Sequence, residues 1–220
     1  MMAHYRAIEE TYERYKEAQE ELHQLRMEQE ADKGLIQQAK ERLASYSSLL
    51  LIEDNAGFGQ VTGDQTASLE GVGTQLRQLL SGLPEDWDLF YLVTMADEWG
   101  PSEQITEELV RLRYGVLTKC YAIQAKMYPV ILRYFDKVLS GRGPIYPVDH
   151  LLADLQRDHY CYAPKGQQLA YRFGSVSEVQ GMDKPVEIKN WQPALHKVEE
   201  ADSRSLWATL VSTLSGWFRR

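Results

Sequence analysis

The chain has 220 residues, of which 32 are acidic and 24 are basic, so its formal net charge is −8. This length is enough for one well-filled α/β domain with additional helices. The acidic balance and the lack of a basic stripe argue against a nucleic-acid partner.

The cysteines and the N-terminal residues indicate in which cellular compartment the protein is found. Cys120 and Cys161 lie far apart and lack zinc-ligand spacing, so two free thiols in a reducing environment are expected. The first residues include several glutamates and lack a basic segment followed by an apolar one, and no apolar run reaches membrane-spanning length. We therefore expect a cytoplasmic protein.

Two helices are expected before the first strand. Over residues 5–29, apolar side chains recur every three or four positions among strong helix formers, which predicts an amphipathic helix. Such a helix is suited to packing or to forming a homodimer. The run Asp32, Lys33 and Gly34 interrupts the pattern, and a second helix is expected over residues 35–44.

The first expected strand ends in a polar turn. Residues 49–52 are four consecutive aliphatic residues, as in a strand covered on both faces within a parallel sheet. Glu53, Asp54 and Asn55 follow directly. Ligands of open α/β sheets gather beyond the carboxyl ends of the strands, so these residues mark a candidate site. The alternative is an apolar strand that ends in an ordinary acidic turn.

Strands and helices are expected to alternate after this turn. The glycines that follow residue 59 lack the spacing of a phosphate-binding loop, so a polar loop is expected there. Strands are expected over residues 87–93 and within 107–117, where residues 111–117 alternate. Helices are expected over 74–80 and 121–139. Pro129 should either bend the last of these helices or mark its first turn.

The final third of the chain contains two features of interest. A helix is expected to begin near Asp149, which would cap it, and short β-like segments are expected over residues 160–179. Near the C-terminus, seven large apolar residues form one helical face, namely Leu206, Trp207, Leu210, Val211, Leu214, Trp217 and Phe218. This face should either pack on the protein or lie at a membrane surface.

Taken in order, several segments resemble glycosyltransferase family 25, the bacterial lipooligosaccharide galactosyltransferases and their relatives. The segments are LLLIEDNAGFG, PEDWDLFYLV, YGVLTKCYAIQAKMYPVIL, PIYPVDHLLADL, HYCYAP and GSVSEVQG. The resemblance extends from about residue 34 to residue 181. It implies an α/β fold of the GT-A type, with a mostly parallel sheet flanked by helices. The N-terminal and C-terminal amphipathic helices are additions to that fold, and the N-terminal helix stands where family members begin with a strand.

The resemblance also implies a site. The family's acidic triplet falls on Glu53, Asp54 and Asn55, so Glu53 and Asp54 would face the ribose and the metal of a UDP-sugar donor. Asp54 and Asn55 would bind Mn²⁺ or Mg²⁺, hard cations that take oxygen ligands. Asn55 replaces an acid and contributes no charge, so the affinity for metal should fall.

A carboxylate must also accept the proton of the attacking hydroxyl. Asp149 matches the family's Pro-x-Asp position and is the candidate catalytic base, or else only a helix cap. Asp97 and Glu98 are the next candidates. His150 and His159 have no ligand spacing, so packing is the more frequent role for such residues.

The expected organisation is a helical extension over residues 1–31, a glycosyltransferase-like α/β domain over 32–185, and a tail over 186–220. The expected activity is transfer of galactose from UDP-galactose to a glycan or lipid-linked glycan acceptor in lipooligosaccharide or surface polysaccharide biosynthesis. Residues 203–220 would hold the protein at the inner face of the membrane. The alternative is a catalytically degenerate relative that acts as a binding or scaffold subunit.

Overall fold

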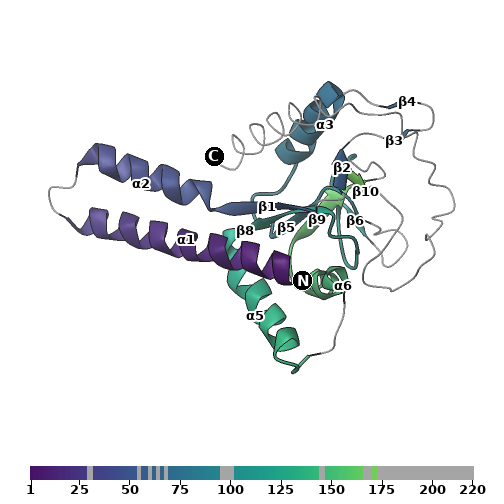
Figure 1. Ribbon diagram of the computed structural model, residues 1–220. Coiled ribbons are helices and arrows are strands. Elements are labelled where there is room, and N and C mark those ends of the chain that lie inside the picture. Colours follow the sequence, from purple (N-terminus) through teal and green to yellow (C-terminus); the bar gives the residue numbers. More distant parts are fainter. Residues whose placement is uncertain are drawn as a thin grey trace.

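The computed structural model describes nine stretches of the chain (Figure 1). These are residues 1–28, 32–53, 56–58, 61–62, 65–66, 69–94, 102–143, 147–165 and 170–172. The expected C-terminal amphipathic helix, together with Asp54, Asn55, Asp97 and Glu98, lies outside them. Within them, no helix combines the length and the apolar character needed to cross a membrane.

A mixed six-stranded sheet forms the centre of the α/β fold, in the order β1-β8-β5-β9-β7-β6. Its strands are β1 (Ser48–Ile52), β5 (Leu89–Tyr91), β6 (Glu103–Gln104), β7 (Leu109–Arg111), β8 (Cys120–Gln124) and β9 (Cys161–Pro164). Among these described strands only β5 and β9 pair in parallel, and the other four ladders are antiparallel. The expectation of a mostly parallel sheet is therefore wrong.

The sheet is mixed because β8 lies between β1 and β5 and runs antiparallel to both. The sequence predicted one helix over residues 121–139. Instead β8 is followed by a 3₁₀ turn, η1 (Ala125–Met127), and then by α5 (Tyr128–Leu139), with Pro129 in its first turn. The first four residues of β8 are buried on both faces, so this segment shows no alternation that would mark it as a strand.

Apolar clusters cover both faces of the sheet, and β1 contributes to each. Leu49 and Leu51 pack against the cluster that includes Tyr121, whereas Leu50 and Ile52 pack against the cluster that includes Trp87. The predicted strand with two covered faces is thus confirmed. However, β1 is an edge strand, and its residues are only half-buried because none of the described strands pairs with its outer side.

Helices form a layer on each side of the sheet (Figure 1). α1 (Met2–Met27), α5 and α6 (Val148–Leu155) supply apolar residues to the cluster on one face, and α3 (Leu69–Ser81) supplies them to the other. The predicted helices over residues 5–29, 74–80 and near Asp149 are confirmed, although α3 begins earlier than expected. The strand expected within residues 107–117 is confirmed as β7, although it ends at Arg111, where the alternating stretch that predicted it begins.

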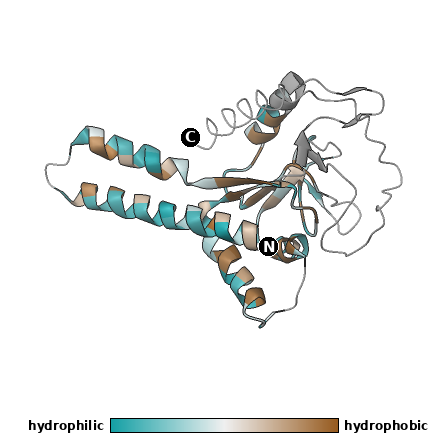
Figure 2. Cartoon of the chain, in the orientation of Figure 1, coloured by the Kyte–Doolittle hydropathy of each residue, from teal (hydrophilic) through white to brown (hydrophobic). Residues whose placement is uncertain are grey.

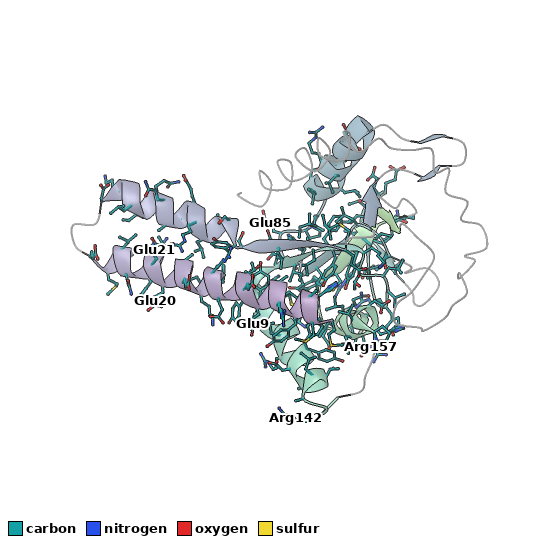
Figure 3. All side chains as sticks on the ribbon, in the orientation of Figure 1. Glu9, Glu20, Glu21, Glu85, Arg142 and Arg157 are labelled. Carbon is teal, nitrogen blue, oxygen red and sulfur yellow. The ribbon has the colours of Figure 1, made fainter. Side chains whose placement is uncertain are left out.

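α1 and α2 (Lys33–Ser45) form an antiparallel hairpin whose far half extends beyond the sheet (Figure 1). Near the sheet, Tyr12 and Tyr15 make edge contacts with Tyr128 of α5. Farther out, Arg42 of α2 forms an ion pair with Glu21 of α1 at 2.9 Å (Figure 3). Hydrophilic residues predominate along the hairpin, in contrast to the apolar strands (Figure 2).

Two small antiparallel ladders complete the described elements. β2 (Ala56–Phe58) pairs with β10 (Ala170–Arg172), and β3 (Val61–Thr62) pairs with β4 (Gln65–Thr66). The polar stretch that follows β2, expected to be a loop, therefore includes short paired segments.

Candidate functional site

Glu53 follows β1 directly and is held by the residues that open β8. Its backbone N–H donates to the carbonyl oxygen of Lys119 at 2.9 Å, which extends the pairing of the two strands by one residue. The Thr118 hydroxyl donates to the Glu53 carboxylate at 3.1 Å, and the Lys119 ammonium forms an ion pair with the same carboxylate. The Glu53 side chain is therefore fixed at the strand end.

His4, in the first turn of α1, completes this cluster. Its Nε2 lies 3.7 Å from the Glu53 carboxylate, and its Nδ1 lies 2.8 Å from the Tyr121 hydroxyl. Burial lowers the pKa of His4, against the opposing effect of the Glu53 carboxylate. A neutral imidazole with its proton on Nε2 would face the carboxylate and accept the hydrogen bond of Tyr121, which satisfies both partners.

Aromatic stacking extends from this cluster across the sheet. The His4 ring stacks on Tyr121 with 5.9 Å between centroids, and Tyr121 stacks on Tyr91 of β5 with 5.8 Å between centroids. Both tyrosines are almost fully buried, and burial raises the pKa of each hydroxyl. At neutral pH both hydroxyls are therefore protonated, and with the His4 proton on Nε2 the Tyr121 hydroxyl is the donor to Nδ1.

β1 and β5 run in the same direction, so their carboxyl ends lie along the same edge of the sheet. This edge is the one at which strands end, not an edge strand. Glu53 donates its backbone N–H to Lys119, and Leu92, just after β5, donates its own to Cys120 at 3.0 Å. Because β8 separates the two strands, their ends lie about 10 Å apart, which is two strand spacings. The chain leaves this edge toward residues 54–55 and 95–101, which lie outside the described residues.

Asp149 lies in the first turn of α6. Pro147 occupies the N-cap position without a side-chain cap bond, and the Asp149 carboxylate accepts the backbone N–H of His150 at 3.0 Å. The predicted cap is thus displaced into the helix, where a carboxylate still complements the helix dipole.

The two histidines considered from the sequence lie apart. His150 Nδ1 is 2.9 Å from the Tyr114 hydroxyl, whereas His159 Nδ1 is 3.6 Å from Asp88. Asp88, just before β5, also pairs with Lys126 at 2.8 Å, at the end of the sheet opposite Glu53. Within the described stretches no group of three histidine, cysteine or acidic residues could hold a metal ion.

Sequence reasoning identified Glu53 but missed the residues that hold it, namely His4, Thr118 and Lys119. One signal was available for His4. It precedes Ile8 by four positions, so both side chains lie on the face of α1 that meets the sheet. Nothing local marked Lys119, which lies 66 positions from Glu53 in the chain.

Comparison with known proteins identifies no relative, because no family model, curated protein or solved structure matches the chain.

Proposed function

We propose that the chain is a glycosyltransferase that transfers galactose from UDP-galactose to a glycan or lipid-linked glycan acceptor in lipooligosaccharide or surface polysaccharide synthesis. The observation that carries this proposal is the shared edge of the sheet. The ends of β1 and β5, each followed by acidic residues, both open there, with β8 between the two strands. In open α/β sheets this is the edge where nucleotide ligands bind.

The proposed reaction uses few side chains. An acceptor hydroxyl attacks the anomeric carbon of the sugar, the bond from that carbon to the diphosphate breaks, and UDP leaves. Asp149 accepts the hydroxyl proton, and its carboxylate is half-buried in the first turn of α6. Asp97 and Glu98 are the next candidates for this role.

Asp54 and Asn55 would hold a divalent cation, which supplies positive charge to the diphosphate when bound. Their donor set, one carboxylate and one amide oxygen, fits Mn²⁺ or Mg²⁺. Glu53 is less suited to bind the cation, because Lys119 and Thr118 already engage its carboxylate. Its part in the proposal is to fix the start of the turn that carries Asp54 and Asn55, next to the ribose.

Thermal shift with UDP and Mn²⁺ tests this function. We expect UDP to raise the melting temperature, Mn²⁺ to enlarge the rise, and Asn55→Asp to enlarge it further, because a second carboxylate strengthens the cation site. Release of UDP from UDP-galactose would then be measured in wild type and in Asp149→Asn. Absence of a UDP shift in both wild type and Asn55→Asp would refute donor binding.

A second function, that of a binding or scaffold subunit without transfer, is favoured by two observations. The Glu53 carboxylate is already satisfied by protein partners, and the α1–α2 hairpin offers a surface beyond the sheet (Figure 1). This function predicts no UDP shift and, if the hairpin mediates association, a homodimer in light scattering. A monomer that releases UDP from UDP-galactose would exclude it.

Contact with the inner face of the membrane through residues 203–220 is a separate part of the proposal. It is supported by the apolar face that includes Trp207, Leu214 and Trp217, which is followed by Arg219 and Arg220. Co-sedimentation with anionic vesicles should be lost when residues 203–220 are deleted. Binding that is unchanged by the deletion would contradict this role.

A further inference from the structure

The segment of residues 114–119 connects the two candidate site residues that the structure describes. At one end, Thr118 and Lys119 hold the Glu53 carboxylate after β1. At the other end, the Tyr114 hydroxyl lies 2.9 Å from Nδ1 of His150, the residue next to Asp149 in α6. A single short stretch of backbone therefore contacts the surroundings of both Glu53 and Asp149.

The middle of this segment is clamped by two buried side chains. Gln156, which follows α6 and is fully buried, accepts the N–H of Gly115 at 2.6 Å and donates to its carbonyl oxygen at 2.8 Å. The hydroxyl of Thr94, after β5, donates to the carbonyl oxygen of Val116 at 3.0 Å. The segment is thus tied to α6 and to the end of β5 as well as to β1.

Two features show that the backbone here is constrained. Leu117 has a φ of +82°, and within the described residues it alone among non-glycine residues has a positive φ. A Cβ at Gly115 would lie 2.5 Å from the Thr94 hydroxyl oxygen, so only glycine fits against that side chain. A residue keeps such an unfavourable backbone conformation only where several surrounding contacts hold it there, and residues of this kind are frequent at functional sites.

We propose that residues 114–119 form a positioning strut, which fixes the start of α6, with Asp149, relative to the end of β1, with Glu53. The inference rests on the proposed function for the roles of Asp149 and Glu53, whereas the coupling of the two ends is a property of the fold. Tyr114, Gly115 and Gln156 are positioning residues, because each acts through the residues that it contacts.

Amide hydrogen exchange in the Gly115→Ala variant tests the strut directly. The new Cβ must displace the segment from Thr94, so exchange should become about tenfold faster at both ends, as for the loss of about one hydrogen bond. The amides to follow are Glu53, bonded to Lys119, and Leu151, bonded to Pro147. Thr94→Ala removes the clashing oxygen together with its hydrogen bond to Val116, so adding Gly115→Ala to Thr94→Ala should make exchange no faster than in Thr94→Ala alone.

A matched control and a milder variant accompany this test. Gly82→Ala adds a Cβ that meets its neighbours no closer than 3.7 Å, so it should leave both amides unchanged. Should Gly115→Ala fail to fold, Tyr114→Phe removes only the hydroxyl that reaches His150, and exchange should still rise at Glu53 as well as at Leu151. Faster exchange at one end alone, or at neither, would overturn the strut.

Kinetics then connect the strut to the reaction. In Tyr114→Phe, kcat for UDP-galactose turnover should fall while KM for the donor stays constant. The same change in an Asp149→Asn background should have no further effect, because the strut acts through Asp149. Additive losses would overturn this link. A wild type without turnover would refute the proposed function and leave the exchange result to decide the strut.

Discussion

Replacement of Lys119 by methionine separates a structural role of Glu53 from a role as a ligand. Methionine keeps most of the apolar stem of lysine and removes the ammonium that pairs with the Glu53 carboxylate. The carboxylate then stays at the end of β1 with the Thr118 hydroxyl and the neutral His4 as its partners. We expect the variant to fold with lower stability.

The size of the expected stability loss follows from how deeply the Lys119–Glu53 ion pair is buried. The Lys119 and Glu53 side chains are 15% and 21% exposed, which places the pair between the surface and the interior. Exposed pairs contribute about 0–1 kcal/mol, and breaking a buried pair costs about 3–5 kcal/mol. Because Thr118 continues to donate to the carboxylate, we expect a loss of about 2 kcal/mol, or about 4–8 °C in Tm for a chain of this size.

Urea denaturation measures this loss of stability, and we expect the loss to differ between pH 7.5 and pH 5.5. Burial is the main cause of the lowered pKa of His4, and the charge of Lys119 adds to it, so removing Lys119 should make protonation of His4 beside Glu53 easier at the lower pH. The loss should therefore be smaller at pH 5.5. In the double variant with Glu53→Gln, part of the stability should return, because no carboxylate is left unpaired.

A loss below about 0.5 kcal/mol, equal at both pH values, is the size expected of a surface substitution and would refute this reasoning. Glu53 would then be free to bind a ligand.

Three further predictions concern other parts of the fold. Burial lowers the pKa of His4 below 6.5, so the His4 imidazole binds a proton more readily in the unfolded chain than in the folded one. The free energy of unfolding should therefore fall as the pH drops below 6.5, by at most about 1.4 kcal/mol per pH unit. His4→Asn should remove this component in urea denaturation from pH 5 to 8, and an unchanged slope would contradict it. Asp88→Asn should lower the free energy of unfolding by about 2 kcal/mol, because Asp88 is buried, accepts the N–H of Tyr160 at 2.7 Å and pairs with Lys126. A loss near zero in urea denaturation would show that these contacts are dispensable. Burial raises the pKa of the Cys120 and Cys161 thiols, so both should react with a thiol reagent only when the protein unfolds, and fast reaction in the native state would disprove their burial.

The sequence by itself predicted the elements that local patterns encode. The 3.6-residue spacing of apolar residues located α1, and four consecutive aliphatic residues located β1 with contacts on both of its faces. The end of β1 just before Glu53 was also predicted, since the composition changes there from aliphatic to acidic. Periodicity and composition are properties of neighbouring residues, so they survive without knowledge of the fold.

Only the tertiary structure decided strand direction and the partners of Glu53. Residues 120–124 form a strand because β1 and β5 lie on either side of them, and their continuous apolar run fits a buried helix equally well. His4 and Tyr121 are 117 positions apart, and Glu53 and Lys119 are 66 apart. Contacts over such separations depend on which distant segments the fold brings together. Here the antiparallel pairing of β8 with β1 brings Lys119 and Tyr121 next to Glu53 and His4.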